Sequence, residues 1–163
     1  MEKEQFKLVT KTKKLSDEVK KHLSCNDIWL IENIGFPERM IGIPIIFAEP
    51  IVVKSNFIYV GYSMYNSVLQ YGIDIKSKNI IIWNSENKTR FFINSTMNQF
   101  LFSSYSYETF IRRLIRKKSL GDYYPNYEIY AYLLRDLIFD IDNTAAEKGG
   151  WYDLITEMSM GAI

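Results

Sequence analysis

The segment 43–93 constrains the fold more than any other part of this sequence. It is dense in β-branched and aromatic residues, which favour strands, and it divides into the runs PIIFAEPIVV, NFIYVGYS, SVLQYGIDI, NIIIWN and TRFFIN. The gaps between the runs are short and rich in Asn, Ser and Lys, which is typical of turns. A parallel crossover needs a dozen residues or more, so these strands must form antiparallel hairpins. The segment therefore predicts a meander of about five to six strands.

Helical patterns precede this segment. Residues 1–25 alternate Lys with apolar positions at helical spacing, and we expect a Lys-rich surface helix there, with Ser16 as an N-cap. Residues 26–35 predict a second short helix or turn that ends at Gly35.

Helical patterns also follow it. Residues 95–118 predict an amphipathic helix, which either Asn94 or Ser95 caps. Residues 126–147 predict the clearest helix, and residues 151–158 add a short one led by Trp151. The order of helices, strands and helices predicts an α+β fold rather than alternating βαβ units. With 163 residues, the chain is expected to form a single domain, 1–163, with the sheet in 43–93 and helices in 95–160 packed on it.

The predicted helix 126–147 has two different sides. One is an apolar stripe that we expect to be buried: Ile129, Tyr130, Leu133, Leu134, Leu137, Ile138 and Ile141. Away from this stripe lie Glu128, Tyr132, Arg135, Asp136 and Asp142, with Asp140 nearer its edge. Such an acidic side is either simply solvated or a partner-binding face, and both readings stay open.

Charge is unevenly divided along the chain. Residues 1–120 carry 18 Lys and Arg against 11 Asp and Glu, whereas residues 121–163 carry 2 against 8, although the whole chain has a net charge of +1. This asymmetry suggests charged partners, or two parts that are each merely solvated. The basic run Arg112, Arg113, Arg116, Lys117 and Lys118 suggests RNA binding as one alternative, although an isoelectric point near 7.7 makes nucleic acid an unfavoured partner.

Several classes of site have no basis in the sequence. The chain has one Cys, Cys25, expected to be a buried inert thiol, and one His, His22, expected to be solvated, which together cannot supply a disulfide or a zinc site. It also lacks a Gly-rich phosphate loop. We therefore expect no enzyme activity, no catalytic residues, no cofactor and no metal. No apolar run reaches about 18 residues and the first residues are highly charged, so we expect no membrane span, no secretory signal and a cytoplasmic location.

Several short motifs are similar to those of one known family. They are Gly35-Phe36-Pro37, Phe57-Ile58-Tyr59-Val60-Gly61, Asp74 followed by Ile80, Phe92-Ile93-Asn94-Ser95-Thr96 with Phe100-Leu101, and Trp151 at the start of a last helix. Over roughly residues 28–115 the chain resembles the SUKH superfamily, and its fourth group most closely. The family often has Gly in the hairpin that here contains Lys78 and Asn79; we expect Asn79 to take the left-handed conformation.

The SUKH superfamily includes bacterial immunity proteins of polymorphic toxin systems. The resemblance implies a non-enzymatic protein that binds and neutralises a cognate toxin, often a nuclease or a nucleic-acid deaminase; a regulatory or scaffold interaction module is the alternative. An acidic C-terminal part could face the positive groove of such a toxin, and Tyr is favoured at contact surfaces. The candidate partner-binding residues are Tyr123, Tyr124, Tyr127, Glu128, Tyr132, Asp136, Asp140 and Asp142. The chain is expected to be a monomer or a weak homodimer.

Overall fold

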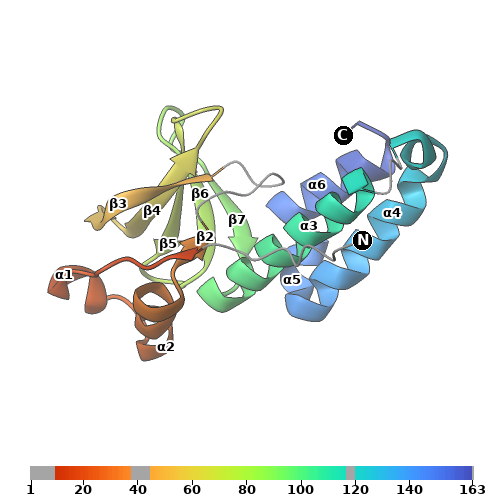
Figure 1. The fold of residues 1–163 in the computed structure, drawn as a ribbon. Helices are drawn as coiled ribbons and strands as arrows, with labels where there is room; N and C mark the ends of the chain where they lie inside the picture. Colours follow the sequence, from red (N-terminus) through yellow and green to blue (C-terminus); the bar gives the residue numbers. More distant parts are fainter. Residues whose placement is uncertain (1–9, 38–44, 117–119, 163) are drawn as a thin grey trace.

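Five antiparallel strands, each hydrogen-bonded to the next one in the chain, form the main sheet (Figure 1). The computed structural model describes residues 10–37, 45–116 and 120–162, without the side chains of 115–125. The predicted meander is confirmed, and its strands are β3 (Ile45–Lys54), β4 (Phe57–Ser63), β5 (Leu69–Asp74), β6 (Ile80–Asn84) and β7 (Arg90–Asn94). A small second sheet, β1 (Thr10–Lys11) paired with β2 (Phe36–Pro37), was not expected.

The β5–β6 hairpin differs in one detail from the prediction. Lys78, and not Asn79, has the left-handed backbone, with a φ of 65°. The carboxylate of Asp74 explains this turn, because its Oδ1 accepts hydrogen bonds from the backbone N–H of Lys76 at 3.0 Å and of Ser77 at 2.8 Å. These bonds bend the chain directly after β5, so the reversal of φ falls on the next residue, Lys78.

The single N-terminal helix predicted for 1–25 is wrong for the described residues from Thr10 onward. After β1 come two short helices, α1 (Asp17–Lys20) and α2 (Cys25–Trp29), and a π-helical turn, η1 (Leu30–Ile34). Ser16 caps α1 as expected, but a second serine, Ser24, accepts a hydrogen bond from Asp27 N–H at 3.0 Å and starts a new helix. Cys25 is exposed at the start of α2, which corrects the expectation of a buried thiol.

Four helices follow the sheet. They are α3 (Met97–Arg116), α4 (Leu120–Ile141), α5 (Asn143–Glu147) and α6 (Gly150–Ser159). The predicted helix 126–147 is therefore two helices, because α4 ends at Ile141 and Asp142 starts α5. Within α4, Asn126 has a non-helical φ of −127°, so the predicted start coincides with a kink inside a longer helix.

The helices pack at one side of the sheet. Figure 1 shows α3, α4, α5 and α6 beside β7, with α1 and α2 at the other end of the molecule, and α3, α5 and α6 each contact β7. One continuous cluster of buried side chains joins both parts; it includes Ile58, Ile80, Phe100, Leu134 and Ile155. The sheet and the C-terminal helices thus share a core, as expected for an α+β domain.

Candidate partner-binding surface

The buried side of α4 is rotated from its predicted position. Leu134 and Ile138 are fully buried, and Ala131 is only 3% exposed. By contrast, Ile129 is 56% and Leu133 is 53% exposed, so their assignment to the buried stripe was wrong. The helix contacts α3 and α6 through the side that contains Ala131, and apolar residues on its other side stay in solvent.

The solvent side of α4 combines large apolar and acidic side chains. Tyr132 is 64% and Phe139 is 45% exposed, in addition to Ile129 and Leu133. Asp136 and Asp140 are exposed, as predicted, and so is Glu128. None of these three carboxylates forms an ion pair with another described residue. We call this surface the α4 outer face and define it as Glu128, Ile129, Tyr132, Leu133, Asp136, Phe139 and Asp140.

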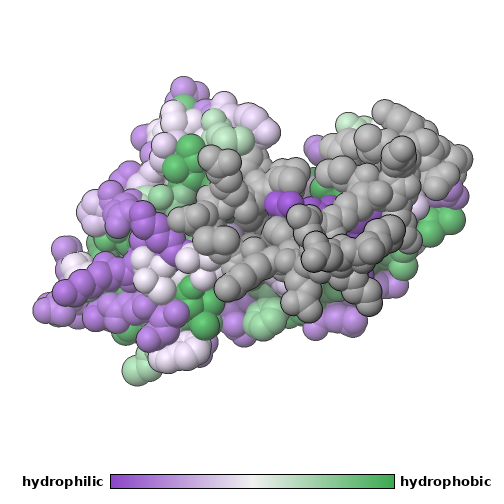
Figure 2. Space-filling view, viewed as in Figure 1, coloured by the Kyte–Doolittle hydropathy of each residue, from purple (hydrophilic) through white to green (hydrophobic). Residues whose placement is uncertain are grey.

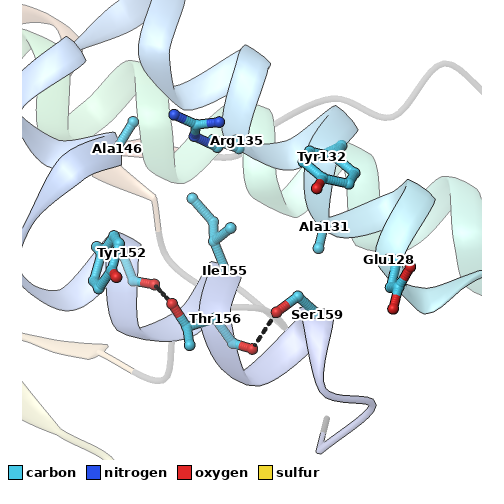
Figure 3. A pocket seen from close by; sticks show the side chains of 9 residues that line it. All are labelled: Glu128, Ala131, Tyr132, Arg135, Ala146, Tyr152, Ile155, Thr156 and Ser159. Atoms are coloured by element: carbon cyan, nitrogen blue, oxygen red, sulfur yellow. Dashed lines mark hydrogen bonds between the residues drawn. The ribbon is translucent and has the colours of Figure 1, made fainter.

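A groove borders the α4 outer face where α4 meets α6. It has a volume of about 330 Å³, and Figure 3 shows its side chains. Ala131, Ala146 and Ile155 form the floor, whereas Tyr132 on α4 and Tyr152 on α6 lie at its rim. Glu128 and Arg135, two turns apart on α4, also line it. The groove therefore places one carboxylate and one guanidinium beside an apolar floor.

The predicted tyrosines have different positions. Tyr132 lies on the α4 outer face, whereas Tyr127 is half-buried and packs against the core. Tyr123 and Tyr124 belong to the first half of α4, but their side chains lie outside the described ones. Of the tyrosines predicted to bind a partner, Tyr132 is the one that the described structure presents to solvent.

Asp142 is a structural residue and not part of this surface, which corrects the prediction. It is 2% exposed and caps α5. Its Oδ2 accepts from Ser95 N–H at 2.7 Å and from Asn94 Nδ2 at 3.1 Å, and its Oδ1 accepts from the Ser95 hydroxyl at 3.1 Å. An aspartate with this many donors holds the end of β7 to the start of α5 and cannot contact a partner.

The expected cap of α3 was also wrong. Thr96 is the residue whose hydroxyl accepts a hydrogen bond from the backbone N–H of Gln99, at 3.2 Å. Asn94, one of the two predicted caps, is fully buried between the sheet and the helices. Its side chain bonds Ser103, Asp142 and Trp151. The motif that was expected to start a helix therefore also ties three helices to β7.

One residue of the basic run at the end of α3 forms an ion pair within the protein. The Nε of Arg112 lies 2.6 Å from the Oε1 of Glu108, whose side chain is fully buried. Arg113 is exposed, and the side chains of Arg116, Lys117 and Lys118 lie outside the described ones. Sequence reasoning missed Glu108, although its spacing of four residues from Arg112 is typical of an ion pair on a helix. Arg112 thus compensates a buried charge, which weakens the RNA-binding alternative.

A second groove lies at the other end of the molecule. It has a volume of about 520 Å³ between α1, α2, the β5–β6 hairpin and the start of α3, and Lys21, His22 and Lys78 are among its lining residues. His22 is half-buried rather than fully solvated, and its backbone carbonyl accepts from Lys78 Nζ at 3.1 Å. Hydrophilic side chains gather over α1 in Figure 2. This groove therefore carries charges of both signs, because Asp27 also lines it.

The described residues form neither a metal centre nor a membrane-spanning helix. Among the described residues, no group of three or more His, Cys, Asp or Glu side chains is arranged to hold a metal ion. In the same part of the chain, no helix is both long and apolar enough to cross a membrane.

Comparison of the chain with models of protein families, with curated proteins and with solved structures finds no match in any of the three. What the protein does must therefore be inferred from the chemistry of its own surface, together with the motifs quoted above.

Proposed function

We propose that this protein is an immunity protein, of the SUKH type that its motifs resemble, which binds and neutralises a toxin acting on nucleic acid. Binding occupies the α4 outer face and blocks the toxin without any chemical step. The observation that carries the proposal is the α4 outer face itself, where Ile129, Tyr132, Leu133 and Phe139 are about half exposed or more, among carboxylates that form no ion pair with another described residue.

The apolar part of this face supports binding to a protein. Single exposed apolar residues are common on soluble proteins, but a contiguous group on one helix face is typical of an interaction site. Tyr132 and Leu133 follow Ile129 by three and four residues, so both are its neighbours on the helix surface and the three side chains form one patch around Ile129. Such a patch supplies the central contacts of an interface, and Tyr is enriched among the residues that dominate binding energy.

The acidic part supports a cationic partner. An enzyme that acts on nucleic acid needs a positively charged groove for the phosphate backbone. Glu128, Asp136 and Asp140 present negative charge to such a groove, and complementary charge accelerates association and excludes other partners. In this proposal the complex forms in the bacterial cytoplasm, where a toxin of this class meets its substrate.

The motifs behind the family resemblance have structural tasks in this chain. A Cβ on Gly61 would lie 2.5 Å from the carbonyl oxygen of Ile46 on the neighbouring strand, so this position needs glycine. Trp151 is 3% exposed and packs edge-on against Tyr107, with ring centroids 5.6 Å apart. These motifs support a shared fold, whereas the binding surface is formed by residues outside them.

The test is to express the chain together with the toxin encoded by the adjacent gene and to measure binding of the purified proteins. We expect a tight complex and protection from toxicity. The variant Asp136→Lys/Asp140→Lys is expected to retain its fold and to associate at least tenfold more slowly at low salt, since like charges then face each other. The matched control, Glu18→Lys/Glu86→Lys, makes the same net charge change at exposed residues far from α4 along the chain.

Two results would contradict the proposal in different ways. If no complex forms and toxicity is undiminished on co-expression, the immunity function is wrong. If a complex forms but both double variants associate at the same rate as the unmodified chain, the function stands and the contact lies elsewhere, for example on the open face of the sheet near Trp83.

A further inference from the structure

We propose that the groove between α4 and α6 binds an extended segment of the partner protein in which a cationic residue and an acidic residue, three positions apart, flank an apolar side chain. This inference rests on the proposed function, because it specifies which feature of a protein partner the site next to the α4 outer face recognises.

The floor of the groove is apolar and formed by small side chains. Ala131 on α4 and Ala146 on α5 are 3% and 1% exposed, and Ile155 on α6 is 7% exposed. Two alanines in the floor leave a trough that larger side chains would fill. Figure 3 shows Ile155 pointing into the space between α4 and α6. A partner side chain of Leu or Ile size fits this floor and removes it from water.

The rim carries tyrosines with free hydroxyl groups. Tyr132 and Tyr152 are 64% and 47% exposed, and neither phenolic oxygen bonds to another described residue. The smaller hydroxyls of the groove are already used, because Thr156 Oγ1 donates to the carbonyl of Tyr152 at 2.8 Å and Ser159 Oγ donates to the carbonyl of Thr156 at 2.7 Å. The aromatic rings and hydroxyl groups of these two tyrosines are therefore available to a bound segment.

The two ends of the groove carry opposite charges. Glu128 and Arg135 are exposed and form no ion pair with another described residue. Figure 3 shows Ser159 toward the Glu128 end and Tyr152 toward the Arg135 end, so α6 runs antiparallel to this part of α4. Seven residues at 1.5 Å per residue separate Glu128 and Arg135 by about 10.5 Å along the helix.

This separation selects the spacing of the occupant. An extended chain in the polyproline II conformation advances about 3.1 Å per residue with three residues per turn, so two of its residues that are three positions apart span about 9 Å and point to the same side. A cation at one of them meets Glu128 and a carboxylate at the other meets Arg135, while an intervening side chain lies on the floor. A segment with two like charges would satisfy one end and be repelled at the other.

The experiment uses the full chain and the blocked tetrapeptide acetyl-Arg-Leu-Ala-Glu-amide as the probe. We expect the probe to shift the backbone amide NMR signals of the residues that line the groove and to leave those around His22 and Lys78 unchanged. The peptides acetyl-Arg-Leu-Ala-Arg-amide and acetyl-Glu-Leu-Ala-Glu-amide are expected to bind at least tenfold more weakly, since a mispaired charge costs more than the loss of one hydrogen bond.

Two variants assign the ends. Glu128→Gln and Arg135→Gln change exposed side chains, and we expect each to retain the fold and to weaken binding of the probe about tenfold. In double-mutant cycles, Glu128→Gln is expected to couple to citrulline in place of the peptide's Arg, and Arg135→Gln to couple to Gln in place of its Glu. The crossed pairs are expected to be additive.

Three results would overturn the inference. The first is that millimolar peptide does not shift the NMR signals of the groove residues. The second is that all three peptides bind equally well. The third is that the coupling energy is the same for matched and crossed pairs of protein and peptide substitutions. If the NMR signals of the groove residues shift with protein concentration before any peptide is added, the occupant of the groove is a second copy of this chain and not a segment of a partner protein.

These results are separable from a failure of the proposed function. A toxin complex that forms normally with the Glu128→Gln/Arg135→Gln variant removes the groove from the interface but leaves the immunity function. If the chain binds the probe peptide but not the toxin, the groove inference stands and the immunity function is wrong.

Discussion

The indole Nε1 of Trp151 donates a 2.8 Å hydrogen bond to the Oδ1 of Asn94, and both side chains are buried. This bond joins the first turn of α6 to the last residue of β7. The amide nitrogen of Asn94 in turn donates to Ser103 on α3 at 3.3 Å and to Asp142, before α5, at 3.1 Å. One asparagine thus connects the sheet to α3, to the start of α5 and to α6.

Replacing Asn94 with Ala is expected to lower the free energy of unfolding by about 3 kcal/mol or more. The substitution leaves the buried Trp151 N–H without its acceptor, which costs about 1–3 kcal/mol, and it also removes one of the donors to the buried Asp142 carboxylate. Urea denaturation measures the change. Asn98→Ala, an exposed position in the first turn of α3, is the matched control and is expected to change the free energy by less than about 0.5 kcal/mol.

The bond itself can be isolated with a second variant. Trp151→Phe keeps a ring against Tyr107 but removes the N–H donor. Because both variants break the same bond, the loss in Asn94→Ala/Trp151→Phe is expected to be smaller than the sum of the two single losses. Additive losses would show that the bond contributes nothing beyond packing.

Replacing Asp142 with Asn is expected to lower the free energy of unfolding by about 2–3 kcal/mol. The carboxylate faces the N–H of Ser95 at 2.7 Å, the Ser95 hydroxyl and the Asn94 amide, so an NH₂ group in place of one oxygen would point at other donors. Asp140→Asn, at an exposed position near the end of α4, is the control. Equal stabilities of the two variants in urea would place Asp142 outside the structural network.

The stability of the sheet is expected to fall in acid through Asp74. Burial by itself would raise the pKa of Asp74, but hydrogen bonds from the Ser77 backbone and hydroxyl and from the Lys76 backbone, together with the charge of Arg90, hold the pKa below its ordinary value of 3.8. Arg90 Nη1 lies 2.5 Å from the Asp74 Oδ2. A folded-state pKa below the unfolded one stabilises the fold above about pH 4, and this contribution is lost as the pH falls through the folded-state pKa.

The variant Asp74→Asn tests this pH dependence. It is expected to be less stable than the unmodified chain near neutral pH, and the difference is expected to shrink as the pH falls below about 4. Urea denaturation at a series of pH values measures both curves. Part of the acid slope is expected to remain, since the pKa values of Glu32 and Glu49 are also lowered, chiefly by hydrogen bonds from Lys20 and Lys13 respectively. Parallel curves for the two chains would contradict the prediction.

The main sheet could be predicted from the sequence because its evidence is local. The strand runs are separated by only a few residues, and a chain cannot return in parallel over so short a gap. The sheet in 43–93 and its antiparallel order follow from this, and the helices of 95–160 follow from the helical spacing of their apolar residues. The N-terminal part could not be predicted as well, because Ser24 stops one helical pattern and starts another that a Lys-rich periodicity hides.

The candidate surface was predicted only in part, since hydropathy does not separate a core residue from a residue kept for a partner. Ile129 and Leu133 extend the apolar stripe of α4, so periodicity assigns them to the core, although they are about half exposed. Asp142 shows the converse error, because it lies off the stripe yet is buried. Its position directly before Asn143-Thr144-Ala145, as the start of a new helix, is the signal that could have identified its capping role.

Two neighbouring leucines on α4 give the sharpest test of which side of this helix is kept for a partner. Leu134 is fully buried, and Leu134→Ala is expected to lower the free energy of unfolding by about 2–5 kcal/mol. Leu133 is 53% exposed, and Leu133→Ala is expected to change it by less than about 0.5 kcal/mol.

The same pair separates stability from binding. If the α4 outer face is the contact, Leu133→Ala raises the dissociation rate of the toxin complex about tenfold, because a side chain at the centre of an interface contributes mainly to residence time. Surface plasmon resonance on the folded variant measures the rate, with Glu86→Ala as a control on a distant exposed turn. An unfolding loss for Leu133→Ala as large as that for Leu134→Ala would mean that Leu133 belongs to the core. A stable Leu133→Ala variant with an unchanged dissociation rate would instead move the interface away from this leucine.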